Sequence, residues 1–376
     1  MSGPLDEHYC YLADRAKVER YKAAIERAVR PGQLVMDLGC GSGLLGLIAL
    51  HSGAYKVLFL EKDPIIEVAR RTVIDAGFGD RAEFYHTSSY ELRLIDRVDV
   101  IICDHVGYFG LDYGILALLA DARHRFLDPD GTIVPADIDL KLAPVETGTE
   151  RELISRWTNG SISPDYAWVG APAANYRYGV HLGSDSLLAA PGALATLELG
   201  ETAEEFLRWQ TDFECSRDGE LDGLLGWFDC RLFADIHMTN SPTTDFRLDR
   251  PQAFFPLECA VRVHKGEKIR TSVMARPADR ILAWTIELPE RGEQFSLSTF
   301  NGLLLDDETL EHSHRDRVAQ LNDRGKALRI VLSYCDGVRT VAEVEAKVRK
   351  EHPDLFPSAL ATTKFIQQAL AWNTKG

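Results

Sequence analysis

A short segment near the N-terminus combines glycines and two carboxylates in a spacing that could bind a charged nucleotide. An apolar run at residues 34–36 ends at Asp37, the sequence Gly-Cys-Gly-Ser-Gly occupies residues 39–43, and a second apolar run at residues 56–60 ends at Glu61. Glycines let the backbone approach a ligand closely, and the helix N-terminus that follows exposes unpaired N–H groups. We therefore predict a strand, a glycine turn, a helix and a second strand with an acid at its tip.

The two acids indicate which nucleotide this turn suits. Glu61 follows Asp37 by 24 residues (61 − 37), close to the interval of roughly 20 expected for an acid that binds both ribose hydroxyls. A dinucleotide turn has the pattern G-x-G-x-x-G, whereas this turn has G-x-G-x-G, and Asp37 would repel a pyrophosphate. Asp37 suits a cation, such as the sulfonium and ammonium groups of S-adenosylmethionine. The alternative is a glycine turn that only closes a corner of the fold.

A second candidate group follows the buried strand expected at residues 99–103. Asp104, His105 and Tyr108 come directly after this strand. Open α/β sheets bind ligands at the carboxyl ends of their strands, so these side chains should face the reacting group.

The elements that would position both groups alternate between strand and helix up to residue 136. We predict a Rossmann-like α/β domain over residues 1–136, opened by one helix at residues 8–30. The other expected elements are helices at 64–77 and 111–125, a strand at 82–86, and a turn at 126–131 that leads into a strand at 132–135.

The character of the sequence changes after residue 136, because strands now follow one another without helices. Residues 137–302 predict an antiparallel β-barrel domain with strands at 137–144, 194–199, 223–235, 252–263, 268–275 and 281–288, the last of which would close the series. An aromatic insertion at about 146–183 predicts a dimerisation arm. Residues 303–376 predict a small winged-helix-like module with helices at 308–332, 340–350 and 358–372.

Composition limits the class of protein. The chain has 376 residues, a net charge of −15, and seven scattered cysteines without a C-x-x-C pair. No apolar run reaches the roughly 18 residues that a membrane span needs, and the N-terminus lacks the form of a signal peptide. We expect a cytoplasmic protein without a metal site that binds neither membranes nor nucleic acid and favours a small or basic substrate. Solubility alone is the other explanation of the charge.

Five stretches resemble the protein arginine methyltransferases, a branch of the class I S-adenosylmethionine-dependent methyltransferases, over roughly residues 8–290. They are YLADRAKVERYKAAI, VMDLGCGSGLL, GAYKVLFLEKD, DVIICDHVGY, and GLLGWFDCRLF together with the segment Ser241-Pro242-Thr243. The resemblance implies a nucleotide-binding domain followed by a barrel, and an arm that makes a head-to-tail homodimer. It also implies S-adenosyl-L-methionine as cofactor and S-adenosyl-L-homocysteine as product.

The resemblance assigns cofactor contacts by position. Glu61 would bind the ribose, Asp37 would face the amino-acid end of the cofactor, and Lys17 stands where the family has an arginine that holds the cofactor carboxylate. Asp14 would orient neighbouring groups. The complete cofactor-binding set implied in this way is Asp14, Lys17, Asp37, Gly39, Cys40, Gly41, Glu61, Lys62, Ser89, Tyr90 and Asp104.

The substrate side departs from the family, which holds a guanidinium bidentately between two glutamates. Here the first position is Asp104 and the second is Tyr113, with Asp112 beside it; LDRPQAFF replaces the Thr-His-Trp loop of the barrel. We expect Asp104 and Asp112 to bind a cationic group and Tyr108 and Tyr113 to line the pocket. His105 would accept the proton, because its ordinary pKa suits neutral pH, or else make a structural hydrogen bond.

Three functions remain open. The first is N-methylation of a small guanidino or amino compound, such as arginine or a derivative. The second is N-methylation of an arginine or other side chain of a peptide or protein recruited by the C-terminal module. Residues 332–370 of that module look like winged-helix domains that bind precursor peptides in natural-product pathways; the alternative, which we favour, is a packing appendage. The third is a catalytically degenerate subunit that binds S-adenosylmethionine and regulates an active partner.

Overall fold

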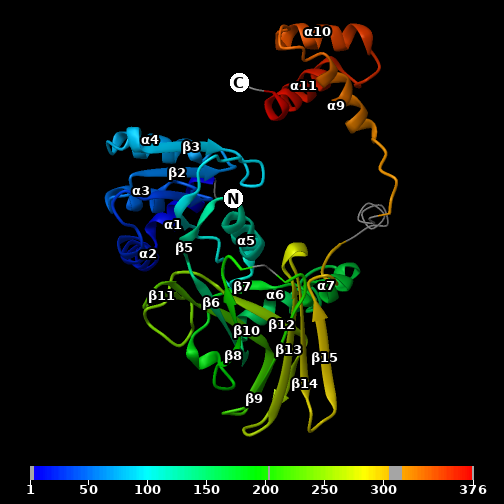
Figure 1. Cartoon of the computed structure of the whole chain (residues 1–376). Helices are drawn as coiled ribbons and strands as arrows, with labels where there is room; N and C mark the ends of the chain where they lie inside the picture. The colour runs from blue at the N-terminus through cyan, green and yellow to red at the C-terminus, as the bar shows by residue number, and fades with distance from the viewer. Residues whose placement is uncertain (1–3, 202–203, 305–315, 375–376) are drawn as a thin grey trace. The chain divides into compact units, whose positions relative to one another are not determined.

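The computed structural model describes residues 4–201, 204–304 and 316–374, and the chain divides into two compact units (Figure 1). The first unit is Met1–Leu304 and the second is Leu305–Gly376. In the described part of the chain, no helix combines the length and apolar character that crossing a bilayer requires.

Two helices, and not the single predicted one, open the first unit. Helix α1 spans Pro4–Ala13 and helix α2 spans Arg15–Ala28. The break falls at Asp14, whose carboxylate accepts a hydrogen bond from the Lys17 backbone N–H at 3.1 Å and so caps α2. Aspartate favours this non-helical cap geometry over a helix interior, and this preference overrides the continuous helical spacing.

A five-stranded parallel sheet in the order β3-β2-β1-β4-β5 forms the α/β part. Its strands are β1 (Leu34–Leu38), β2 (Lys56–Glu61), β3 (Ala82–His86), β4 (Val98–Ile102) and β5 (Leu127–Val134). The helices between them are α3 (Leu44–His51), α4 (Ile66–Asp75) and α5 (Ile115–Arg125). Most side chains of the central strands β1, β2 and β4 are apolar and buried, as expected for a sheet covered on both faces.

Two local predictions in this part are wrong. The turn expected at residues 126–131 lies largely within β5, because Leu127 already pairs with Val98 ahead of a register shift. The helix expected from residue 111 begins only at Ile115. It is preceded by a 3₁₀ turn, Asp112–Gly114, in which Tyr113 has φ of 56° and Gly114 has φ of 71°, and such dihedrals interrupt a helix.

Two antiparallel sheets complete the first unit (Figure 1). One has the order β7-β12-β10-β6-β8, with β11 paired to β10, and the other has the order β15-β14-β13-β9. The strands are β6 (Asp137–Val145), β7 (Tyr178–Val180), β8 (Gly192–Glu198), β9 (Leu207–Glu214), β10 (Gly219–Phe233), β11 (Ile236–Thr239), β12 (Gln252–Val263), β13 (Lys268–Arg276), β14 (Ile281–Leu288) and β15 (Glu293–Ser298).

The predicted antiparallel domain is confirmed, although its strand list was incomplete. Strands β7, β9, β11 and β15 were not predicted, and β14 does not close the series. Strands β9 and β15 are the two edges of their sheet. In β15 the many polar side chains weaken the apolar alternation that reveals a strand, whereas β9, LRWQTDFE, has that alternation and could have been found.

The aromatic insertion is mostly short helical turns. It contains α6 (Glu152–Ser155), α7 (Gly170–Ala174) and two 3₁₀ turns, Gly148–Arg151 and Pro164–Val169. Its aromatic side chains Tyr166, Trp168 and Tyr176 are exposed. An exposed aromatic surface is compatible with the predicted role in dimerisation, which stays a prediction.

The second unit has three described helices, α9 (Asp323–Ser333), α10 (Val341–Glu351) and α11 (Ala359–Asn373). The predicted capping box at the start of α10 is present, formed by Thr340 and Glu343. The helix predicted at 308–332 begins only at Asp323, after the cap Asn322; residues 308–315 lie outside the described part. The core of this unit is small and apolar: Val331, Val344, Val348, Ile366, Ala369 and Leu370.

Candidate active site

One cavity of about 570 Å³ lies at the carboxyl ends of β1, β2 and β4. Helices α1 and α2, the glycine turn and the segment before β12 also contribute to its walls. The predicted site residues that line it are Asp14, Lys17, Asp37, Gly39, Cys40, Gly41, Glu61, Lys62, Asp104, His105, Tyr108 and Tyr113. The fold therefore gathers residues from positions 14 to 113 around one space.

The glycine turn has the conformation that its sequence requires. Gly39 and Gly41 have φ of 69° and 52°, in the left-handed region that favours glycine. The backbone N–H groups of Gly39 and Cys40 both donate to the Leu60 carbonyl, at 2.8 and 3.0 Å, which ties the turn to β2. A Cβ at Gly39 would lie 2.1 Å from Cε1 of His105, so no larger residue fits there without movement.

Glu61 and Asp37 supply the carboxylates of the cofactor side of the cavity. Glu61 accepts the N–H groups of Gly41 and Asp63, each at 3.0 Å, and Asp37 accepts the Gly46 N–H at 2.7 Å. Neither carboxylate forms an ion pair with any residue that the structure describes. Burial, reinforced by the charges of Glu61 and Asp104, raises the pKa of Asp37 to about 7. These residues fit S-adenosylmethionine, because its positive charges would replace the missing counter-ion.

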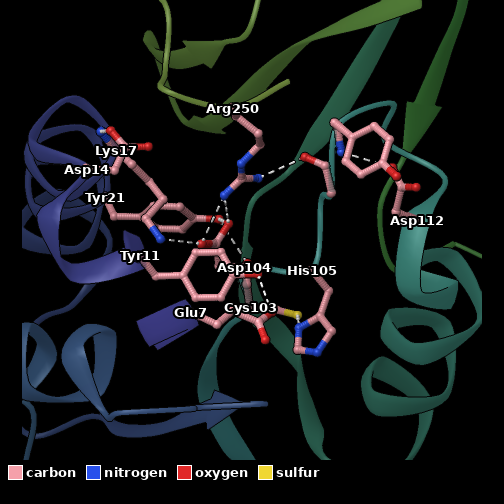
Figure 2. A network of polar contacts seen from close by, with 12 residues as sticks. Glu7, Tyr11, Asp14, Lys17, Tyr21, Cys103, Asp104, His105, Asp112 and Arg250 are labelled. Carbon is pink, nitrogen blue, oxygen red and sulfur yellow. Dashed lines mark hydrogen bonds and ion pairs between the residues drawn. The ribbon is translucent and has the colours of Figure 1, made fainter. Parts of the chain in front are cut away.

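Asp104 is in the opposite situation, since its carboxylate already has two cations (Figure 2). Lys17 Nζ lies 3.0 Å from Oδ2, and Arg250 Nη2 lies 3.3 and 3.4 Å from the two oxygens. The Tyr21 hydroxyl donates to Oδ1 at 3.2 Å. Although burial alone raises the pKa of Asp104, the charges of Arg250 and Lys17 outweigh burial and lower it. Asp104 is therefore ionised and charge-balanced.

Arg250 and Tyr21 were not predicted as site residues. Arg250 Nη1 also donates to the Gly107 carbonyl at 3.0 Å, and its side chain is only 10% exposed. Tyr21 is buried and donates to the Cys103 carbonyl at 3.0 Å. The sequence does contain a sign of the role of Arg250. This charged residue stands two positions before the apolar strand β12, in the LDRPQAFF segment that differs from the arginine methyltransferases.

His105 packs against the glycine turn. Its Nδ1 lies 3.3 Å from Cys103 Sγ, and its ring meets the ring of Tyr113 edge-on at 6.1 Å between centroids. Burial lowers the pKa of His105, so the imidazole is neutral at pH 7. A neutral imidazole can accept a proton, which agrees with the predicted role without testing it.

Asp112 does not line the cavity, contrary to its predicted place beside the substrate. Its carboxylate accepts the backbone N–H groups of Tyr108 and Phe109 at 2.9 and 2.8 Å and pairs with Arg177. The side chain is 5% exposed. Because these three partners occupy its oxygens, Asp112 stabilises the turn that carries Tyr108 and is not available to a substrate.

Ser89 and Tyr90 also lie outside the cavity lining. The Ser89 carbonyl accepts a hydrogen bond from Arg125 at 2.6 Å, and Tyr90 is 62% exposed. Both residues lie in the loop after β3. The sequence correctly placed them near the end of a strand, but it did not show whether their side chains point into the cavity.

Comparisons with known proteins agree with this geometry. Residues 22–138 match the family model described as ribosomal protein L11 methyltransferase (PrmA). The chain is 32% identical over 140 residues to a probable protein arginine N-methyltransferase 6 of Arabidopsis thaliana, covering 37% of this chain and 32% of that protein. It is 27% identical over 269 residues to an arginine N(omega)-methyltransferase of Streptomyces achromogenes subsp. streptozoticus, covering 70% and 74%.

Two solved structures show the same fold. The Trypanosoma brucei PRMT1 enzyme-prozyme heterotetrameric complex with AdoHcy superposes with a TM-score of 0.67 at 19% identity, over 77% of this chain and 96% of that one. Protein arginine methyltransferase 10 of Arabidopsis thaliana gives 0.67 at 20% identity, over 78% and 98%.

The glycine turn with its two acids, the sheet order and these matches define a class I S-adenosylmethionine-dependent methyltransferase. Within that class, the antiparallel sheets after the Rossmann-like part make the chain arginine methyltransferase-like in architecture.

Proposed function

We propose that this methyltransferase acts on a nitrogen atom of a small guanidino or amino compound, such as free arginine or a derivative. The charge of the cavity carries the proposal. Three lysine or arginine side chains line it, Lys17, Lys62 and Arg250, against seven carboxylates: Glu7, Asp14, Asp37, Glu61, Asp63, Asp104 and Asp249. A cavity with this excess of negative charge attracts cations and repels anions.

The Streptomyces relative supports the small-molecule form of this proposal. Its name specifies arginine, without mention of a protein, and it aligns with 70% of this chain. Relatives named as protein arginine N-methyltransferases align with 72% and 73% of this chain, so the support comes from the name of the Streptomyces relative and not from the length of its alignment.

The cofactor supplies an electrophilic methyl group, and the residues of this chain hold and deprotonate the partners. Glu61 would accept the ribose hydroxyls and Asp37 would balance the cofactor's positive charge. Lys17 has three N–H donors, so it would hold the cofactor carboxylate while it keeps its contact with Asp104. An amine or guanidine must lose a proton to present a lone pair. His105 is the candidate acceptor, because it is neutral and faces the same cavity.

Mass spectrometry of products from a panel of amines and guanidines, with free arginine first, tests the proposal. We expect one methyl group of S-adenosylmethionine on a nitrogen, and we expect Asp104→Ala to lose transfer while calorimetry still detects S-adenosylhomocysteine binding. Unchanged turnover in Asp104→Ala, or an oxygen or carbon as the methylated atom, would contradict it.

A peptide or protein acceptor is the second candidate, supported by relatives named as protein arginine methyltransferases and by the separate second unit. Deletion of residues 305–376 distinguishes the two. Only a substrate recruited by that unit should lose affinity, whereas methylation of a small compound should persist.

A regulatory subunit is the third candidate, and the enzyme-prozyme assembly of the Trypanosoma relative supports considering it. Such a subunit would bind S-adenosylmethionine and methylate no member of the panel by itself.

We further propose that the chain forms a homodimer through residues 146–183. Light scattering of wild type and Trp168→Ala tests this, because loss of an exposed aromatic contact should weaken the dimer.

A further inference from the structure

The carboxylate of Asp104 has no vacant oxygen for a guanidinium. A carboxylate offers about four acceptor positions. Lys17 contacts Oδ2, the Tyr21 hydroxyl contacts Oδ1, and Arg250 contacts both oxygens (Figure 2). A bidentate acceptor must therefore displace one of these partners.

Arg250 is the partner that an acceptor would displace. Its contacts with Asp104, at 3.3 and 3.4 Å, are longer than the 3.0 Å contact of Lys17. Tyr21 and Arg250 each have a second bond to a backbone carbonyl, of Cys103 and of Gly107, both at 3.0 Å, but the Tyr21 hydroxyl lies in the core and does not line the cavity. Arg250 belongs to the irregular segment before β12 and lines the cavity, so its side chain borders the space that an acceptor enters.

Arg250 also has the same chemical group as a guanidino acceptor. One of its nitrogens, Nη2, bridges both oxygens of Asp104, and these are the two oxygens that a bidentate substrate guanidinium would need. A primary ammonium, in contrast, is a compact point charge that can share a single oxygen, so it competes less directly with Arg250.

We propose that Arg250 is a specificity-determining residue, whose guanidinium occupies on Asp104 the place that a guanidino acceptor would take. A guanidino acceptor binds only when Arg250 gives up that carboxylate, and a primary amine does not need this exchange. The inference rests on the proposed function and refines it, because it ranks primary amines ahead of guanidines as acceptors of the wild-type protein.

The chain offers a matched control in Arg177. This arginine pairs with the buried Asp112 and lies over the Tyr108 ring at 4.6 Å, but neither Arg177 nor Asp112 lines the cavity. Arg177→Met removes one arginine from a buried carboxylate near the site without vacating Asp104.

The experiment compares wild type with Arg250→Met, Arg250→Lys and Arg177→Met, all in the full chain loaded with S-adenosylhomocysteine. Calorimetry measures the binding of free arginine and of free lysine to each protein. Both ligands have the same net charge, so any gain that arises only from removing a positive charge is equal for the two. Their ratio therefore isolates the competition for the two oxygens of Asp104.

We expect Arg250→Met to tighten arginine binding by about tenfold relative to lysine, with Arg250→Lys in between and Arg177→Met unchanged. In methyl transfer the same change should appear in KM and not in kcat. Equal or weaker arginine binding by Arg250→Met would overturn the inference, and so would an equal gain for both ligands or the absence of arginine binding in every protein. If Arg250→Met does not retain S-adenosylhomocysteine, Arg250→Lys decides by the same ratio.

Failure of the proposed function has a different signature. In that case no protein methylates any amine or guanidine, while the ratio of arginine to lysine binding still responds to Arg250. Transfer to arginine that is insensitive to Arg250 would instead preserve the proposed function and reject the inference.

Discussion

The carboxylates on the two sides of the cavity have different kinds of partner. On the cofactor side, Asp37 and Glu61 accept only backbone N–H groups, and no described lysine or arginine pairs with them. On the other side, Asp104 is paired with Lys17 and Arg250. The first arrangement leaves a charge for a ligand to balance, whereas the second has balanced its charge within the chain. On the proposed function, affinity for the cofactor would depend on Asp37 and Glu61, and selectivity for the acceptor would depend on the ion pairs of Asp104.

Glu61→Ala should have the largest effect of these substitutions, a loss of cofactor affinity. It removes two carboxylate–N–H bonds and the expected acceptor of the ribose hydroxyls. Each hydrogen bond to a charged group contributes roughly 1.5–3 kcal/mol, so cofactor affinity should fall by about 100-fold or more. Calorimetry with S-adenosylhomocysteine measures this loss. Glu67→Ala on the exposed face of α4 is the control, and comparable losses in both variants would contradict the assignment of Glu61.

Asp37→Asn should remove a pH dependence. Because Asp37 has a pKa of about 7, a cationic cofactor must bind its ionised form, so affinity should fall by about tenfold per pH unit below 7. Asparagine still accepts the Gly46 N–H but cannot ionise. The variant should therefore bind S-adenosylmethionine weakly and equally across this range, and a retained pH slope would place the titrating group elsewhere.

The same variant has a predicted effect on stability. The folded protein holds a proton on Asp37 that the unfolded chain releases near pH 4, so stability falls as pH rises from about 4 to 7. Above pH 7 the ionised carboxylate destabilises the cofactor-free fold by on the order of 4 kcal/mol. Asp37→Asn should accordingly raise the unfolding free energy of the cofactor-free protein at pH 8, measured by urea denaturation, and have little effect at pH 4.

Asp104→Asn and Asp112→Asn should separate chemistry from stability. Asp112 has a buried ion pair with Arg177 and lies outside the cavity, so its replacement should cost about 3–5 kcal/mol of stability. The cofactor affinity of that variant should remain. Asp104→Asn should instead lose methyl transfer at saturating acceptor. Denaturation and initial rates on both variants test this, and a purely catalytic defect in Asp112→Asn would return that residue to the site.

Tyr21→Phe should have the smallest effect of these substitutions, and it tests how much the tyrosine hydroxyl contributes to the environment of Asp104. It removes one neutral hydrogen-bond donor from Asp104 and leaves both cations in place. We expect a loss of about 1 kcal/mol in stability and a change of a few-fold in kcat/KM. A larger loss than in Asp104→Asn would show that the tyrosine, and not the cations, sets the state of the carboxylate.

The cofactor side could be predicted from the sequence because it is local. Asp37, the glycine turn and Glu61 lie within one strand–helix–strand unit, and their spacing alone defines their geometry. The acceptor side is not local. Arg250 reaches Asp104 across 146 residues, and Arg177 reaches Asp112 across 65 residues. No spacing rule connects such positions, so the sequence suggested two free acids where the fold supplies two ion pairs.

The limits of the fold prediction have similar causes. The capping box at Thr340 was predicted because it is a short local pattern. The break at Asp14 was not predicted, because the surrounding residues have continuous helical spacing and the break arises only when the Asp14 side chain caps α2. Strand β9 has a clear alternation, LRWQTDFE, that the prediction missed, whereas β15 has only two apolar residues, Phe295 and Leu297.

The contact between Gly39 and His105 has a consequence for evolution and engineering of this enzyme. The imidazole fills the volume that any other residue at position 39 would claim. Substitution of this glycine would therefore push aside the candidate proton acceptor as well as distort the backbone near the nucleotide. Any side chain added at position 39 therefore requires a smaller or displaced residue at position 105.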